Sequence, residues 1–227
     1  MHFTPEDHGR ISAAIAKAEA GTSGEIFCVI SRQVSTYRDI RLAWAAAASL
    51  VLPAILIPLG LSGDWFGFSN DWQVAHAASQ SDEVNRALTA YALAQVITFI
   101  GVYLLSKIPF LGLLMVPQRV RRSRVRRVAL QQFMAHGLHA TVDRTGVLIF
   151  AAMADHEVEV IADTGIYTQT SPEFWGSTVS VLVKHIKQGD PITGMENAIA
   201  MCGQALAEKF PPRHDDVNEV PDHLIVL

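Results

Sequence analysis

Three acidic side chains stand where the ends of predicted strands meet. Asp143 lies just before one predicted strand, Asp163 lies just after the next, and Glu25 begins the first strand. Consecutive strands of a hairpin place the two aspartates at the same edge of a sheet. Calcium and magnesium take carboxylate oxygens as ligands, and a bound cation polarises a phosphate ester. The pattern therefore predicts a metal site of Asp143 and Asp163, with Glu25 as a third donor and the two aspartates as candidate catalytic residues.

A second interpretation of the same aspartates needs no metal. Aspartate side chains commonly brace turns by accepting hydrogen bonds from nearby backbone N–H groups, especially close to a glycine. Gly146 follows Asp143 by three residues and Gly165 follows Asp163 by two. The sequence shows no spacing typical of an EF-hand loop. Both interpretations stay open from the sequence alone.

The sequence lacks the usual motifs of nucleophilic and nucleotide-binding enzymes. It contains no Cys-x5-Arg loop, no GxSxG elbow, no P-loop and no GxGxxG fingerprint. Cys28 and Cys202 lie in apolar runs without the spacing of a disulfide framework or a zinc site, so we expect two buried free thiols. His136 and His139 are interpreted as an ordinary pair at a helix end, where they interact with the helix dipole.

The elements that position these residues follow from hydrophobic patterning. The runs Glu25–Ile30 and Gly146–Met153 are continuously apolar, which is typical of strands buried on both faces. The run His156–Ala162 alternates and predicts a strand paired with its predecessor in a hairpin. Helices are predicted to begin after a cap at Thr4 and at Pro172. The chain thus indicates an α/β domain.

Two long apolar stretches interrupt this α/β pattern. Leu42–Leu61 and Leu88–Leu105 are each about 18–20 residues long, enough as helices to cross a hydrocarbon core of roughly 30 Å. Lys107 interrupts the second stretch, and apolar residues resume as far as Val116. The second span therefore ends either at Leu105, followed by an interfacial segment, or at Val116, as a longer tilted helix.

Basic residues flank the two stretches asymmetrically. The connecting segment 62–87 carries one arginine, Arg86, and several acidic residues, whereas arginines precede the first stretch and crowd behind the second. The positive-inside rule then predicts a multi-pass protein of the inner, cytoplasmic membrane with both termini in the cytoplasm. The arginines behind the second stretch are also expected to contact anionic lipid headgroups, at about 1 kcal/mol each, and not nucleic acid. They are Arg119, Arg121, Arg122, Arg124, Arg126 and Arg127.

The chain is therefore expected to be one soluble domain divided by a membrane hairpin. Residues 1–41 form the first part of that domain and residues 118–212 the second. Residues 42–117 form the transmembrane hairpin, with 62–87 as its extracytoplasmic loop. Residues 213–227 form a C-terminal tail, whose apolar end is able to add an edge strand.

Four segments of the soluble parts together resemble a known family. They are Gly24–Ile26, Asp143–Ile149, His156–Ile166 and Asn218–Asp222. These segments resemble the TPM domain family, named after thylakoid, photosystem-associated and receptor-modulator proteins. The likeness is to its bacterial membrane-protein branch, with the TPM domain interrupted here by the transmembrane hairpin.

The resemblance implies an α/β fold with a small central sheet of about four strands flanked by helices. It also implies an accessory or interaction factor for the assembly, repair or modulation of other membrane proteins. The alternative that it implies is a divalent-cation-dependent, membrane-bound acid phosphatase, with calcium or magnesium as its cofactor. The expected partners are the membrane, anionic headgroups and another membrane protein. The resemblance also implies a domain that lies outside the cytoplasm in many relatives, whereas the arginines of this chain predict the cytoplasmic side.

Overall fold

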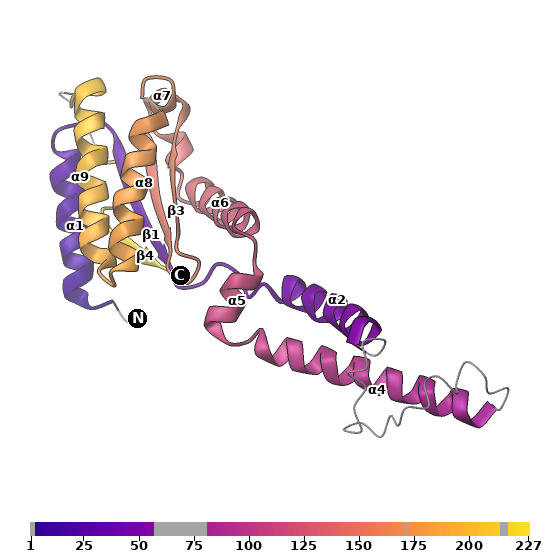
Figure 1. Ribbon diagram of the computed structural model, residues 1–227. Coiled ribbons are helices and arrows are strands. Elements are labelled where there is room, and N and C mark those ends of the chain that lie inside the picture. Colours follow the sequence, from indigo (N-terminus) through magenta and orange to yellow (C-terminus); the bar gives the residue numbers. More distant parts are fainter. Residues whose placement is uncertain (1–2, 57–80, 171, 214–217) are drawn as a thin grey trace. The chain divides into compact units, whose positions relative to one another are not determined.

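The computed structural model describes residues 3–56, 81–170, 172–213 and 218–227. The chain divides into two compact units, and Figure 1 labels most of their elements. Unit 1 consists of residues 1–36 and 118–227, and unit 2 of residues 37–117.

Unit 1 is built on a four-stranded mixed sheet in the order β3-β2-β1-β4. The strands are β1 (Glu25–Ser31), β2 (Gly146–Ala152), β3 (Glu157–Ala162) and β4 (Leu224–Val226). β1 runs parallel to both β2 and β4, and β2 and β3 form the predicted antiparallel hairpin. Every residue of β1 and β2 is buried, as the continuous apolar runs predicted for central strands.

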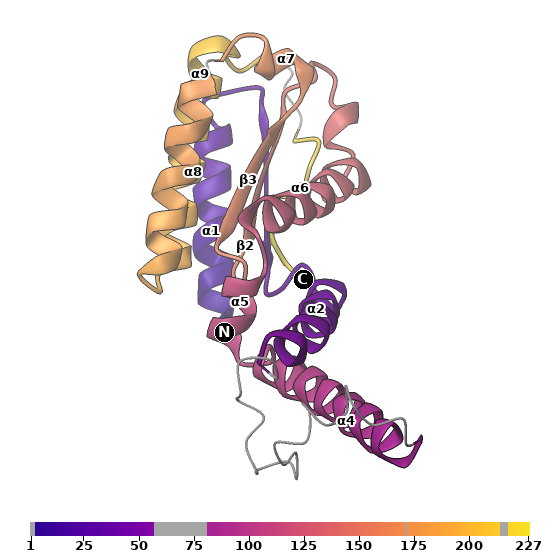
Figure 2. The ribbon, with the colours of Figure 1, turned by 45° about the vertical axis from the view of Figure 1, so that its right-hand side comes forward.

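Helices cover both faces of this sheet. The helices α1 (Pro5–Glu19), α8 (Pro172–Lys187) and α9 (Pro191–Lys209) lie on one face, and α6 (Gln118–Ala135) lies on the other. Figure 2 shows the three layers of unit 1, with the sheet between α6 and the other helices. The expected α/β fold with a small sheet of four strands is therefore confirmed.

Local sequence signals set the helix ends in unit 1. Thr4 and Asp7 form a capping box at the start of α1, in which the Thr4 Oγ1 accepts the Asp7 N–H at 3.2 Å. Gly137 follows α6 with φ of 71°, a left-handed conformation that costs glycine little. Two short helices complete the unit, η3 (Leu138–Ala140) and α7 (Thr164–Tyr167).

Unit 2 contains the two apolar helices. They are α2 (Arg38–Leu56) and α4 (Ser81–Leu105), and α5 (Pro109–Met115) follows as a separate helix. α4 ends at Leu105, which is the shorter of the two predicted ends of the second span, and the membrane span itself stays a prediction. α2 continues through Pro53, and the predicted span end at Leu61 and most of the predicted loop 62–87 lie outside the described residues.

The start of β2 approaches another backbone segment too closely for any side chain. A Cβ added at Gly146 would overlap the carbonyl oxygen of Leu138, and that backbone cannot move aside as a side chain would. We expect Gly146→Ala to lower the free energy of unfolding by about 1–3 kcal/mol, as overpacking typically does. Urea denaturation of the detergent-purified chain, followed by circular dichroism, measures this change.

The matched control is Gly9→Ala, on the exposed side of α1, where an added Cβ meets nothing within 4 Å. Since alanine is the better helix former, this variant should gain up to about 1 kcal/mol. Equal stability of Gly146→Ala and the parent chain would contradict the close approach.

Candidate functional site

The backbones of the three predicted acidic residues do meet at one end of the sheet. Glu25 pairs with Gly146 in the register of β1 and β2, and the Asp163 N–H donates to the Gly146 carbonyl at 2.9 Å. A Cβ added at Gly165 would lie 2.9 Å from the carbonyl oxygen of Asp143, so that loop also packs here. The hairpin thus places both aspartates at the same edge, as its topology predicted.

The three side chains, however, have separate partners. The Asp143 Oδ2 pairs with Arg213 at 2.9 Å, and this pair is partly exposed. The Asp163 Oδ1 accepts the Thr164 N–H at 2.6 Å and caps α7, as the turn interpretation expects. Among the described residues, no group of three His, Cys, Asp or Glu side chains is arranged to hold a metal ion. The metal site of Asp143, Asp163 and Glu25 therefore stays a prediction.

Glu25 is the most deeply buried of the three, and only one of its two carboxylate oxygens accepts a hydrogen bond. Its side chain lies at the start of β1, with 6% of the residue exposed. The Glu25 Oε1 accepts the Glu219 N–H at 3.1 Å, whereas its Oε2 is buried without a hydrogen-bond partner. Burial raises the pKa of the Glu25 carboxyl, and the N–H groups of Glu219 and Val220 oppose that shift. A buried carboxylate oxygen without a donor is costly, so this group is a candidate for binding.

Glu25 lines a cavity of about 300 Å³, which we call the acidic pocket. The cavity lies where the end of α1, the start of β1 and the C-terminal segment before β4 come together. Its walls combine carboxylates with small apolar side chains. The lining residues are Ala16, Glu19, Ala20, Thr22, Gly24, Glu25, Pro212, Asn218 and Asp222.

Hydrogen bonds hold the walls of the acidic pocket in place. The Glu19 Oε1 accepts the Ile26 N–H at 2.7 Å, which ties the end of α1 to β1. The Thr22 hydroxyl donates to the Phe210 carbonyl at 2.7 Å. The Asn218 Nδ2 donates to the Asp222 Oδ1 at 2.5 Å, which orients the aspartate beside the pocket.

Glu19 carries a strongly shifted carboxyl. Burial raises its pKa from 4.5 to about 9, and the negative charges of Glu25 and Asp222 act in the same direction. The N–H of Ile26 opposes the shift. At neutral pH Glu19 therefore keeps its proton and shares a hydrogen bond with Asp222.

Sequence reasoning did not single out Glu19 or Asp222 as site residues. Asp222 belongs to the C-terminal segment that carries the family resemblance, which was a usable signal. Glu19 stands at the end of a helix, where an acidic residue is normally solvated, so its sequence position gives no signal. Glu19 and Asp222 come together only because the C-terminal segment returns to pair with β1 as β4.

The arginines of α6 are used in different ways. The Arg121 Nη1 donates to the Asp155 carbonyl at 3.3 Å, and the Arg124 Nη1 donates to the Ser35 Oγ at 2.7 Å. Arg122 and Arg126 approach Glu159 of β3 at 3.5 and 3.7 Å. Burial raises the pKa of Glu159, and the two arginines oppose that shift. Four of the six arginines that were predicted to contact headgroups therefore also contact other residues of unit 1.

The two cysteines are buried free thiols, as expected. Cys28 lies in β1 and Cys202 in α9, both with 0% of the residue exposed. Burial raises the pKa of both thiols, that of Cys202 to about 12. Since the thiolate is the reactive form, neither residue is suited to nucleophilic chemistry.

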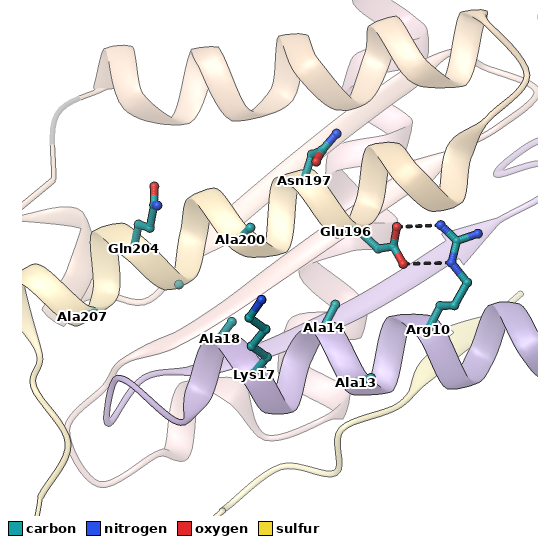
Figure 3. A pocket seen from close by; sticks show the side chains of 11 residues that line it. Arg10, Ala13, Ala14, Lys17, Ala18, Glu196, Asn197, Ala200, Gln204 and Ala207 are labelled. Atoms are coloured by element: carbon teal, nitrogen blue, oxygen red, sulfur yellow. Dashed lines mark hydrogen bonds and ion pairs between the residues drawn. The ribbon is translucent and has the colours of Figure 1, made fainter.

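A larger groove of about 740 Å³ lies between α1 and α9, where Figure 3 shows Arg10 and Glu196 joined by two bonds. The Arg10 Nε and Nη2 donate to the two Glu196 carboxylate oxygens at 2.9 and 2.7 Å. Most of the remaining lining consists of alanine and neutral polar side chains. The groove thus presents an ion pair, Lys17 and mostly small or neutral side chains.

The raised pKa of Glu19 makes stability depend on pH in a defined direction. Between its ordinary pKa of 4.5 and about 9, the unfolded chain loses this proton while the folded chain keeps it. The contribution of Glu19 to stability is therefore full below pH 4.5 and is lost progressively up to about pH 9. Because glutamine cannot ionise, Glu19→Gln should lose less stability between pH 5 and 9 than the parent chain.

Thermal unfolding of the detergent-purified chain at pH 5, 7 and 9 measures this dependence. The matched control is Glu208→Gln, which makes the same change at a side chain that is 73% exposed. The control should follow the parent chain at all three pH values. If Glu19→Gln also follows the parent chain, the prediction that the half-buried Glu19 keeps its proton is wrong.

Comparisons with known proteins fit this structure. The model of the TPM domain matches residues 113–205, a range that includes α6, β2, β3 and α8. The NMR structure of BA42 protein from the psychrophilic bacterium Bizionia argentinensis is similar to this chain with a TM-score of 0.56 and 20% identity. That likeness covers 100% of this chain and 97% of the other and shows a shared fold. The comparison with curated proteins gave no match. Residues 113–205 are therefore similar to the TPM domain.

Proposed function

We propose that this chain is a membrane-anchored TPM domain protein that acts as an accessory factor for other membrane proteins, in their assembly, repair or modulation. The observation that carries the proposal is the apolar surface of unit 2. α2 and α4 are long and apolar enough to cross a membrane. Within α4, none of the residues Leu88–Leu105 is buried in the structure.

The exposed side chains of α4 favour lipid as their surroundings. At 1.5 Å per residue, 18 residues of helix span about 27 Å, close to the hydrocarbon thickness. Large apolar side chains on this helix are about half exposed, which is unfavourable in water over such an area. They include Leu93, Val96, Ile97, Ile100, Leu104 and Leu105.

We place both parts of unit 1 on the cytoplasmic side. The arginines of α6 follow the second apolar helix directly, and the positive-inside rule retains such clusters in the cytoplasm. Arg119 and Arg127 are exposed side chains on α6 and are suited to contact anionic headgroups. This placement keeps β1 and β2 on one side of the membrane, as their pairing requires.

The alternative, a divalent-cation-dependent phosphatase, gains no support from the described residues. Phosphate hydrolysis needs a nucleophile or a water activated by a metal. Asp143 is paired with Arg213, Asp163 caps α7, and the two thiols are buried. An interaction role requires no nucleophile or metal, and unit 1 offers a pocket and a groove for contact with a partner.

Membrane anchoring predicts that charges on the exposed face of α4 release the protein. Val96 and Ile100 are 53% and 50% exposed, and an arginine at the centre of a span costs about 2.5–3.5 kcal/mol. We expect Val96→Arg/Ile100→Arg to lower the fraction of the protein that resists alkaline extraction of membranes. The control is Leu130→Arg, the same kind of change at a 42% exposed position of α6, which should remain in the membrane.

The accessory role predicts an effect on other membrane proteins. Depletion of the chain should lower the level of at least one assembled membrane complex on native gels, with soluble complexes unchanged. The parent chain should restore that level and Val96→Arg/Ile100→Arg should not. Unchanged membrane complexes after depletion would contradict the accessory role, and full extraction of the parent chain at alkaline pH would contradict the anchor.

A further inference from the structure

We infer that the acidic pocket receives one basic side chain, a lysine ammonium or an arginine guanidinium, from a partner protein. The inference rests on the proposed accessory function and states how unit 1 would hold its partner. It assigns the contact to Glu25, Glu19 and Asp222 at the end of the sheet.

The unsatisfied oxygen of Glu25 is the first argument. The residue is 6% exposed and lines the pocket, and its Oε2 is buried without a hydrogen-bond partner. A carboxylate has about four lone-pair sites, and the described donors at Glu25 are two backbone N–H groups, that of Glu219 on the other oxygen and that of Val220. A cationic N–H donor is the partner that a buried carboxylate binds most strongly.

The second argument is an imbalance of charge. Glu19, Glu25 and Asp222 all line the pocket, and none of the described residues that line it is a lysine, arginine or histidine. The nearby Arg213 pairs with Asp143 at 2.9 Å and lies 4.0 Å from Glu219, outside the pocket lining. Like charges that share a site repel each other, and either protons or a cation relieve the repulsion.

The third argument is the shape and chemistry of the walls. Ala16, Ala20 and Pro212 supply apolar surface beside the carboxylates. Lysine and arginine side chains have an apolar stem and a charged tip, and both parts find complementary surface here. The described residues form no group of three ligands for a metal ion, so the organic cation is the better occupant.

The proton on Glu19 supports the same conclusion. With a pKa of about 9, Glu19 is neutral at pH 7 while the pocket is empty, and it shares a hydrogen bond with Asp222. A cation beside the pair favours the ionised carboxyl. Binding should therefore release a proton, which calorimetry detects as a heat that depends on the ionisation enthalpy of the buffer.

Three peptides test the inference on the full chain in detergent. They are acetyl-Gly-Gly-X-Gly-Gly-amide with lysine, arginine or norleucine as X. Norleucine keeps the apolar stem of lysine and removes the charge. Isothermal titration should show binding of the lysine or arginine peptide and at least about tenfold weaker binding of the norleucine peptide.

Variants locate the binding site. Glu25→Gln and Asp222→Asn each keep the size of the side chain and remove a charge, and each should weaken binding by about tenfold or more. Glu208→Gln, on the exposed end of α9, should bind as the parent chain does. Circular dichroism of each variant shows whether it is folded. Two pocket variants are used so that the test can still be made if one of them does not fold.

Several outcomes would overturn the inference. Equal binding of the lysine and norleucine peptides, or binding unchanged in both folded pocket variants, excludes a cation site in the pocket. Calcium or magnesium binding that is lost in Glu25→Gln, without peptide binding, would make it an inorganic ion site. If no peptide binds but depletion still lowers the level of a membrane complex, the accessory role is supported and the assignment of the pocket is wrong. If the basic peptides bind but depletion changes no membrane complex, the assignment of the pocket is supported and the accessory role is wrong.

Discussion

The parallel pairing of β1 with β2 is the constraint on which the rest of the structure depends. Seven pairs of residues, from Glu25 with Gly146 to Ser31 with Ala152, join strands that are separated by the whole of unit 2 and α6. A parallel pair always needs a crossover connection, which is usually a single helix. Here the crossover contains two helices of membrane-spanning length. If they cross a membrane as we propose, the sheet forms only when the chain leaves and returns on the same side.

This pairing also creates the candidate site. Because β1 and β2 start in register, Glu25 is buried at the edge where the Asp143 loop and the Asp163 cap lie. β4 then pairs with β1 from the far end of the chain, and the segment before it brings Asp222 beside Glu19. The acidic pocket is thus assembled from segments distant in sequence, each held by the central strand.

Elements with strong local signals were predictable from the sequence. The apolar runs of β1 and β2 and the helix that begins after Thr4 appear as expected, because each depends on residues within a few positions. The partners of the acidic side chains were not predictable. Asp143 pairs with Arg213, which is seventy positions away, and such a contact depends on packing that no local pattern encodes.

The most direct test of the account is the accessibility of single cysteines at Lys17, Ser180 and Ser69 to an impermeant thiol reagent. Lys17 in α1 and Ser180 in α8 come from the two separated parts of unit 1, and Ser69 comes from the predicted outer loop. The native thiols, both buried, give little background. The account predicts labelling at 69 in intact cells and labelling at 17 and 180 only after the membrane is permeabilised. Labelling of 17 and 180 from opposite sides would contradict it, because β1 and β2 could not then pair.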